Sequence, residues 1–432
     1  MSKRKLKHIN TGIAVFVTSF LLADPAGAES LKSAVRRAMN THPEIAALGH
    51  NRQAINEELE AAKGLWRPTV DVVGKAGGYT DRNTTQEKYE VSAVISQPLF
   101  DGGRGYHEEE RQRERIKSAQ NRVADTANAI ALRVAQAYTE VQRSHAILAA
   151  ARRNLRELSN IAYMVNRRAR GGKGNRAETA QARARVAAAK AGLAEARQRV
   201  RDAYALYITT VGKKPGKLTT GAPRLNQMPR SLSTAISRAR SRSPKILALR
   251  HDALAAKAAI GTAEAVLMPK LNLEVSGNYA NELYGTSART TNGKALVVLK
   301  WNLYNGGINS ARVREAKFRE SESRSLSQVA GLNIEREVRI SWSAMLAARD
   351  RANYLRRQLS ANRVALSVQK RQFEAGKRTL LDILDTQNEV FTTETALKTE
   401  IYVARFNTYR VLAAMGRLVS SLNIALPQAA KD

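Results

Sequence analysis

The side chains that most often carry catalysis or bind metals are sparse in this 432-residue chain. It contains no Cys, which excludes disulfides, thiolate metal sites and a cysteine nucleophile. The six His residues lack HExxH spacing, so we expect no metal site. The run Gly171-Gly172-Lys173-Gly174 looks like a phosphate-binding loop, but it does not fit GxxxxGK and follows no strand. We therefore predict neither an enzyme nor a cofactor.

One pair of carboxylates has a spacing that places both groups together. Asp382 and Asp385 are three residues apart, which puts them on the same face of a helix. Acidic residues in the first turn of a helix also interact favourably with its dipole, so a purely structural role is the alternative. The elements that position this pair decide between the two roles.

The N-terminus has the three parts of an export signal. Basic residues from Lys3 to Lys7 precede an apolar run from Gly12 to Leu22, and Ala26-Gly27-Ala28 follows as a small-residue cleavage pattern. We predict that residues 1–28 are a secretory signal peptide, with a short buried helix as the alternative. No other stretch approaches ~18 consecutive apolar residues, so we predict no transmembrane helix.

The strong positive charge has to be read together with export. The chain has 71 Lys and Arg against 38 Asp and Glu, a formal net charge of +33. Such a charge in a cytoplasmic protein would suggest nucleic acid as the first partner. The predicted signal peptide opposes that interpretation, and the basic residues are spread along whole helices. We expect no nucleic-acid partner and keep a basic helical nucleic-acid-binding protein as the weakest alternative.

Two intervals without Pro, 99–214 and 270–426, predict exceptionally long helices. A helix over 104–169 would be about 100 Å long at 1.5 Å per residue. Apolar and small residues alternate at steps of four and three, which indicates packing in a left-handed supercoil. In the first interval these positions are Ile130, Val134, Ala137, Val141, Ser144 and Leu148; in the second they are Ile334, Val338, Ser341, Met345, Ala348, Ala352, Leu355, Leu359, Asn362 and Leu366.

The chain is also an internal duplication. Residues 42–45 resemble 243–246 at an offset of 201, and residues 97–103 match 301–307 at an offset of 204. We predict a first repeat with a hairpin, a long helix and a return helix, a linker, a second repeat of the same plan, and a tail. Their bounds are 31–216 (hairpin 69–100, long helix 104–169, return helix 176–210), 217–230, 231–421 (hairpin 270–304, long helix 308–375, return helix 379–416) and 422–432.

The predicted hairpins alternate apolar and polar residues over segments of about ten, as the strands of membrane β-barrels do. A soluble half-buried sheet shows the same alternation and is the alternative. Trp66, Phe100, Trp301 and Tyr304 lie at the strand–helix junctions, where an interfacial aromatic girdle would place them. Four strands cannot close a barrel, and open edges cannot face lipid, so the chain must form an oligomer.

Two motifs carry a family resemblance over nearly the whole exported chain. Gln97-Pro98-Leu99-Phe100-Asp101-Gly102-Gly103 and the segment from Ala375 to Asp385 resemble the TolC-type outer membrane factors. These are exit ducts of type I secretion and multidrug efflux. The resemblance implies a mixed α and β membrane protein of a Gram-negative outer membrane. It would be a homotrimer with a 12-stranded β-barrel, continuous with a long α-helical coiled-coil barrel in the periplasm.

The resemblance also implies partners and a gate. The partners would be a periplasmic membrane-fusion adaptor, an inner-membrane transporter of the ABC, RND or a similar class, and outer-membrane lipid. Asp382 and Asp385 match an acidic pair that forms a ring around the closed periplasmic end. Arg378 and Glu178 match residues that hold this gate shut. Phe373 stands where the family has an aromatic hydroxyl, so part of the closing network is missing.

The helix-turn tips match the family's adaptor-binding positions, and these are Gly172, Lys173, Gly376 and Lys377. The two lysines replace residues that are usually apolar in the family, which suggests an electrostatic contact; solvated lysines at helix ends are the alternative. A periplasmic adaptor-like coiled-coil protein is the second candidate function, although its single helical hairpin would not explain duplicated strands. The cargo stays open, with a weak preference for the type I secretion branch.

Overall fold

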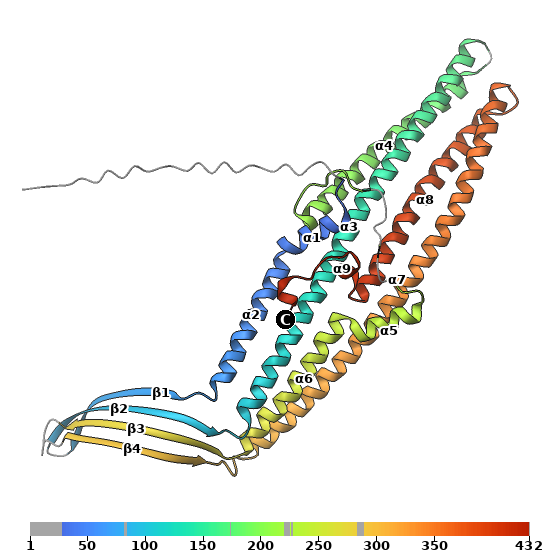
Figure 1. Cartoon of the computed structure of the whole chain (residues 1–432). Coiled ribbons are helices and arrows are strands. Elements are labelled where there is room, and N and C mark those ends of the chain that lie inside the picture. The colour runs from blue at the N-terminus through green and yellow to red at the C-terminus, as the bar shows by residue number, and fades with distance from the viewer. Residues whose placement is uncertain are drawn as a thin grey trace, which may run out of the picture.

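The two halves of the chain lie side by side in an elongated structure with a sheet at one end and two helical hairpins at the other (Figure 1). The computed structural model describes residues 28–81, 84–172, 174–219, 225, 228–282 and 289–431. The predicted signal peptide, except for Ala28, lies outside the described residues. Within the part described, no helix has both the length and the apolar character needed to span a membrane.

Each half contains the same series of elements. In the first half these are α1 (Leu31–Thr41), α2 (Pro43–Gly64), β1 (Thr69–Asp81), β2 (Thr84–Phe100), α3 (Arg104–Arg170) and α4 (Arg176–Val211). In the second half they are α5 (Leu232–Arg242), α6 (Pro244–Glu264), the 3-10 turn η1 (Ala265–Leu267), β3 (Lys270–Glu282), β4 (Arg289–Lys300), α7 (Ile308–Glu374) and α8 (Leu380–Ala414). The short α9 (Leu418–Ser421) and η2 (Gln428–Ala430) follow. The predicted mixed architecture with a duplicated plan and four strands per chain is confirmed.

The long helices α3 and α7 have 67 residues each, so each is about 100 Å long. Their predicted seams are the faces that pack. All six seam residues predicted for α3 are buried, from Ile130 to Leu148. In α7, eight of the ten are buried, including Val338 and Met345, while Leu355 and Asn362 are half-buried. Small residues along these seams allow neighbouring helices to approach closely.

The four strands form one antiparallel sheet in the order β1-β2-β3-β4. Its register aligns the predicted apolar positions: Val70 pairs with Ile95, Ile95 with Val275, and Val275 with Ala295. One face is therefore apolar across all four strands, yet Val70 and Ile95 are 66% and 45% exposed in the protomer. No described segment of the chain packs against this face, and the outer edges of β1 and β4 have no partner strand in the described sheet.

The second hairpin is shorter than predicted. We expected it to extend to residue 304, but β4 ends at Lys300. The reason is that Lys300 pairs with Lys270, the first residue of β3, so residues 301–304 have no neighbouring strand. In the first hairpin β2 reaches Phe100, because a bulge beyond Pro98 lets Phe100 pair with Leu271.

The turn that connects β2 to α3 is formed by residues 101–103. Gly102 and Gly103 have φ values of 75° and 88°, which favour glycine. A side chain at Gly102 would also lie 2.6 Å from the carbonyl oxygen of Ala265. Asp101 then accepts hydrogen bonds from the backbone N–H groups of Gly103 (2.9 Å) and Gly105 (2.6 Å), which satisfies the first turn of α3.

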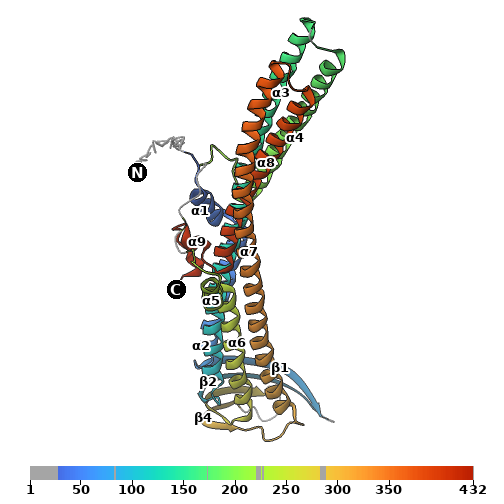
Figure 2. The same ribbon diagram turned by 90° about the vertical axis from the view of Figure 1, so that its right-hand side faces the viewer.

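A second layer covers one side of the helices near their middle. Figure 2 shows α1, α9 and the C-terminus on the same side of α3 and α7. The core there joins α1 to α3, α4 and the C-terminal segment and includes Leu31, Val134, Tyr207 and Leu418. These short elements therefore cover one face of the long helices near their middle. The two helical hairpins continue beyond the covered region.

Candidate functional site

The two hairpins end in equivalent turns. Gly172 and Gly376 have φ values of 74° and 77°, where a side chain would introduce strain of about 1 kcal/mol. Lys377 donates its backbone N–H to the carbonyl of Gln372 at 2.8 Å, and its side chain is exposed. Lys173, the other predicted tip lysine, lies outside the described residues. The predicted contact of these tips with an adaptor stays a prediction.

Asp382 lies in the first turn of α8 and caps it. Thr379 accepts a hydrogen bond from the Asp382 N–H at 3.3 Å, and the Asp382 carboxylate accepts from the Thr379 N–H at 3.2 Å and from its hydroxyl at 2.8 Å. These bonds to the ionised form, together with Arg378 at 3.8 Å, hold the pKa of Asp382 below its ordinary value. The carboxylate is therefore charged at neutral pH and still 37% exposed.

Asp385 faces the other hairpin. Its carboxylate lies 3.2 Å from the guanidinium of Arg185 on α4 and remains 57% exposed. Asp382 and Asp385 are thus both open to solvent, while Ile383 and Leu384 between them are buried. The spacing predicted that the two aspartates share a helix face, and their role in a gate stays a prediction. The contact with Arg185 was not predicted.

The predicted latch residues do not meet within one chain. Arg378 donates from Nε to the side-chain oxygen of Gln372 at 3.1 Å and lies near Asp382. Glu178 donates its backbone N–H to the side-chain oxygen of Asn175, the N-cap of α4, at 2.7 Å. Among the described residues no ion pair or hydrogen bond joins Arg378 to Glu178, so the protomer alone does not form this latch.

Phe373 takes part in a contact that sequence reasoning missed. Its ring is 1% exposed and lies under the guanidinium of Arg168, 4.4 Å from the ring centre. Arg168 also donates to the carbonyl oxygen of Phe373 at 2.9 Å. A cation over an aromatic face is attracted by the ring, and here it joins α3 to the end of α7. Phe373 therefore takes part in a link between the two hairpins, although it has no hydroxyl group.

Further polar contacts join the hairpins below their tips. Lys370 on α7 contacts Glu157 on α3 at 2.6 Å. Arg153 on α3 contacts Glu394 on α8 at 2.7 Å, and Arg363 approaches the same carboxylate at 3.3 Å. The contacts of Lys370 with Glu157 and of Arg153 with Glu394 each join the two halves over more than 200 positions, so no local sequence pattern could reveal them.

The predicted girdle aromatics lie between the sheet and the helices, and all are exposed in the protomer. Trp66 and Phe100 are 36% and 45% exposed, and Trp301 and Tyr304 are 55% and 85% exposed. The indole N–H of Trp301 donates to the carbonyl of Leu267 at 3.0 Å, which fixes the ring beside η1. Their proposed place at a membrane interface stays a prediction.

In the described ranges no three His, Asp or Glu side chains gather in a way that could hold a metal ion. The polar groups at the hairpin ends form caps and ion pairs, and they offer no set of groups arranged for proton transfer or nucleophilic attack. What this region can do is attract or repel ions and hold two hairpins together.

The family model of the outer membrane efflux protein matches residues 34–208 and 235–402, most of both repeats. The chain is similar to the outer membrane efflux protein BepC of Brucella suis, with 26% identity covering 94% of this chain and 90% of BepC. It is similar to the outer membrane protein TolC of Vibrio cholerae, with 23% identity covering 97% of this chain and 99% of TolC.

The fold agrees with solved structures. A crystal structure of CusC superimposes with a TM-score of 0.80 and 19% identity, covering 92% of this chain and 95% of that one. At this identity the likeness concerns the fold alone. It extends over both repeats, including the sheet and the helical hairpins.

Proposed function

Because this chain belongs to the outer membrane efflux protein family, we propose that it is the exit duct of a tripartite export system, closed at its periplasmic end by the aspartates of α8. It is a channel protein rather than an enzyme, and it resides in the outer membrane and extends into the periplasm of a Gram-negative bacterium. The observation that carries the gate is the exposed pair Asp382 and Asp385 in the first turns of α8.

Channels of this family function as trimers, and the sheet supplies the physical need for one. The four strands present an apolar face and two open edges, and three copies would give twelve strands closed into a barrel. The apolar face, with Val70, Ile95 and Val275, would then contact lipid. Trp66, Phe100, Trp301 and Tyr304 would lie near the periplasmic interface of the membrane.

The gate follows from the same symmetry. Three copies of Asp382 and Asp385 place six carboxylates around one axis, a ring that attracts cations and repels anions. The lowered pKa of Asp382 keeps its share of that charge at neutral pH. Arg378 and Glu178, which do not meet within one chain, would form their latch between neighbouring chains. Arg168, Arg185 and Lys370 would hold the hairpins of each chain together in the closed state.

Energy and cargo selection would come from partners. The turns at Gly172, Lys173, Gly376 and Lys377 form the far end of the helical hairpins, and we propose that they dock to a periplasmic adaptor. The adaptor would connect the duct to an inner-membrane transporter of the ABC, RND or a related class. Whether the system exports small molecules or proteins is a property of those partners.

The proposal is tested by single-channel conductance of the detergent-extracted trimer in planar bilayers. Wild type should show small, cation-selective openings. The double variant Asp382→Asn/Asp385→Asn should keep the channel but lose most of its preference for cations. Glu195→Gln is the matched control, because among the described residues Glu195 on α4 pairs with Arg199 of its own helix and no other, and it should not affect the ring.

The outcomes separate the duct from the gate. If the double variant has the same selectivity as wild type, the protein is still a duct, but the proposed acidic ring is wrong. If trimeric, membrane-extracted protein forms no channel, both the proposed duct and the proposed acidic ring are wrong. Arg378→Ala should raise the resting conductance, and an unchanged value would exclude Arg378 from the closing contacts.

A further inference from the structure

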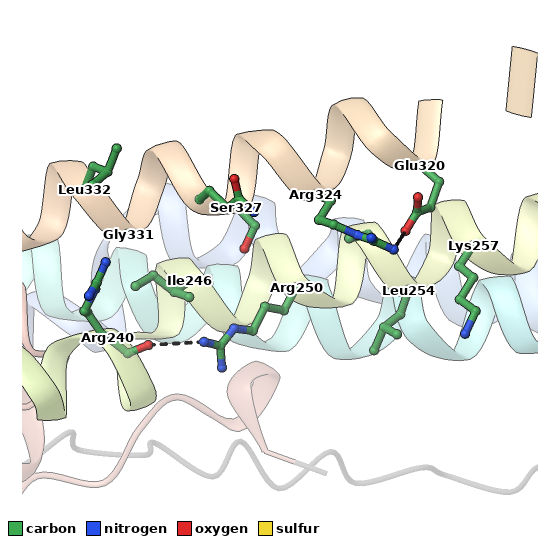
Figure 3. A pocket seen from close by; sticks show the side chains of 12 residues that line it. Arg240, Ile246, Arg250, Leu254, Lys257, Glu320, Arg324, Ser327, Gly331 and Leu332 are labelled. Atoms are coloured by element: carbon green, nitrogen blue, oxygen red, sulfur yellow. Dashed lines mark hydrogen bonds and ion pairs between the residues drawn. The ribbon is translucent and has the colours of Figure 1, made fainter. Parts of the chain in front are cut away.

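A basic groove runs between α6 and α7 and is not used by the proposed duct or its gate (Figure 3). Its volume is about 830 Å³. The end of α5 lines it at one side through Arg240. Other lining residues come from α6 and α7, and those that matter here are Ile246, Arg250, Leu254, Lys257, Arg324 and Leu332.

The first repeat has the equivalent groove, between α2 and α3, and there the chain's own C-terminal tail fills it. Arg52 on α2 donates from Nη1 to the carbonyl oxygens of Gln428 (3.4 Å) and Ala429 (3.1 Å). A Cβ on Gly49 would lie 3.5 Å from Ala429, which places that residue directly against α2. On α3, Gln120 donates to the carbonyl of Lys431 at 3.5 Å.

The internal duplication shows that the two grooves correspond position by position. The helices α2 and α6 begin 201 residues apart, at Pro43 and Pro244, and α3 and α7 begin 204 apart. The tail-contacting residues therefore map onto lining residues of the open groove. The pairs are Gly49 and Arg250, Arg52 and Ala253, Gln120 and Arg324.

In the second repeat no described segment of this chain takes the place of the tail. Leu225, from the linker that follows α4, packs against the first-repeat core instead. Both grooves open on the side of the helices that bears the short elements, since α5 lines one and η2 occupies the other. The second groove is thus the counterpart of the surface that holds the tail, and no described segment of the chain occupies it.

The charges and apolar surfaces that line the open groove define what it would bind. Arg250 and Lys257 are exposed, and no described acidic side chain forms an ion pair with either. The one acidic lining residue, Glu320, is already paired with Arg324 (Figure 3). Between the charges lie apolar surfaces: Leu254 is 47% exposed and Leu332 is 63% exposed.

We propose that this groove binds an extended acidic segment of a partner protein, along the path that the C-terminal tail takes in the first repeat. Small apolar side chains of the segment would cover Leu254 and Leu332. Its carboxylates would pair with Arg250, which stands where the first repeat has Gly49, and with Lys257. This contact lies far from the hairpin tips, so it would be a docking surface additional to the adaptor contact.

The probe for a test is a fluorescein-labelled peptide based on the tail itself. It has the sequence of residues 425–432 with the substitutions Gln428→Glu and Lys431→Glu, and the comparison peptide has Lys at both positions. Fluorescence anisotropy is measured on the full-length trimer in detergent. The acidic peptide should bind, and raising the salt from 50 to 300 mM should weaken it, because exposed charge pairs are screened.

Arg250→Ser/Lys257→Ser should weaken binding of the acidic peptide at least tenfold. The control Arg156→Ser/Arg167→Ser removes two exposed arginines of α3 near its tip and should leave binding unchanged. Equal binding of the two peptides, equal binding to the groove variant, or no binding to wild type would each overturn the proposal. The absence of binding to wild type would also be the outcome if a neighbouring copy covered the groove in the trimer, and the proposal would be wrong in that case too.

The readout is independent of conductance. If wild type shows the expected conductance and selectivity but does not bind the peptide, the groove proposal is wrong and the proposed duct is unaffected. Retained trimers on gel filtration ensure that a weak signal from the variant does not come from unfolding.

Discussion

The two return helices occupy equivalent places in the duplicated plan, but they carry opposite charge. Helix α4 has seven Lys and Arg against three acidic residues, whereas α8 has three against five. Their ends meet where Arg185 pairs with Asp385. The difference teaches that, after duplication, the two copies diverged into complementary surfaces. The second copy supplies the exposed aspartates of α8, and the first supplies Arg185, which pairs with Asp385.

The same divergence affects how each hairpin is held at its tip. In the second hairpin Phe373 is buried under Arg168 of the first, while the counterpart of Phe373 at the offset of 204 residues is Ala169, which has no ring. The second hairpin therefore supplies the aromatic ring of this contact, and the first supplies the cation. Opening a channel at this end would require the contacts of α7 and α8 with the first hairpin to break. Variants that remove these contacts one at a time should therefore differ in how strongly they open the channel.

The largest effect should come from Phe373→Ala. Removing a fully buried aromatic ring costs about 3–5 kcal/mol, because it leaves a cavity and removes the surface on which Arg168 lies. We expect faster hydrogen exchange in the tip of α7 and a higher resting conductance. The comparison variant Tyr163→Ala, at an exposed position, should alter neither. A tight channel with Phe373→Ala would show that this contact does not hold the two hairpins closed.

The two N-caps provide a more even comparison. Asn175 caps α4 and Thr379 caps α8, and replacing either with Ala should cost about 1 kcal/mol of local helix stability. Hydrogen exchange of the first-turn amides should increase in both variants. Only Thr379→Ala should also change the conductance, because only α8 carries the acidic pair. Equal conductance changes from both caps would contradict the asymmetry between the hairpins.

The charge pair between the return helices should contribute less. Exposed ion pairs contribute about 0.2–1 kcal/mol, so Arg185→Ser should raise the resting open probability by no more than about fivefold. The exchange Arg185→Asp/Asp385→Arg keeps the pair with reversed signs and should restore much of the closure. If the exchanged channel is as leaky as Arg185→Ser, the pair does not contribute through its charge.

The smallest change should be a shift in pH dependence. The pKa of folded Asp382 lies below its unfolded value, so its stabilising ionised form is present above the unfolded pKa and is lost as the pH falls through the folded one. The contribution of Asp382 to cation selectivity should therefore persist to a lower pH than that of an ordinary aspartate. Thr379→Val removes the hydroxyl bond and should move this midpoint to higher pH, whereas Thr379→Ser should not. Bilayer measurements from pH 7 to 3 compare the three channels.

Sequence patterns were reliable where the physics is local or periodic. The heptad seams around Val134 and Val338 predicted buried faces because the spacing of side chains on a helix is fixed by its geometry. The alternation in β2 and β3 predicted one apolar face because side chains alternate across a strand. The end of β4 was predicted wrongly at residue 304, since a strand's length depends on its partner and β3 begins only at Lys270.

The candidate site was predicted in part. The exposed aspartates of α8 could be found from their spacing and motif. Arg168 and Arg185 could not, because their partners Phe373 and Asp385 lie about 200 residues away in the other repeat. The groove beside α6 was also invisible, since only the folded tail against Arg52 shows that its counterpart binds a peptide segment.

The amino-acid sequence by itself determined the long helices, the faces they bury, the strands and the duplicated plan. These depend on backbone propensity and on the periodic placement of apolar side chains, and both act over a few turns or pleats. Only the tertiary structure decided which charged residues meet, how the hairpins are clamped and which groove the tail leaves open. Those contacts depend on how two repeats pack against each other, and that packing brings together residues whose separation in the chain has no local signature.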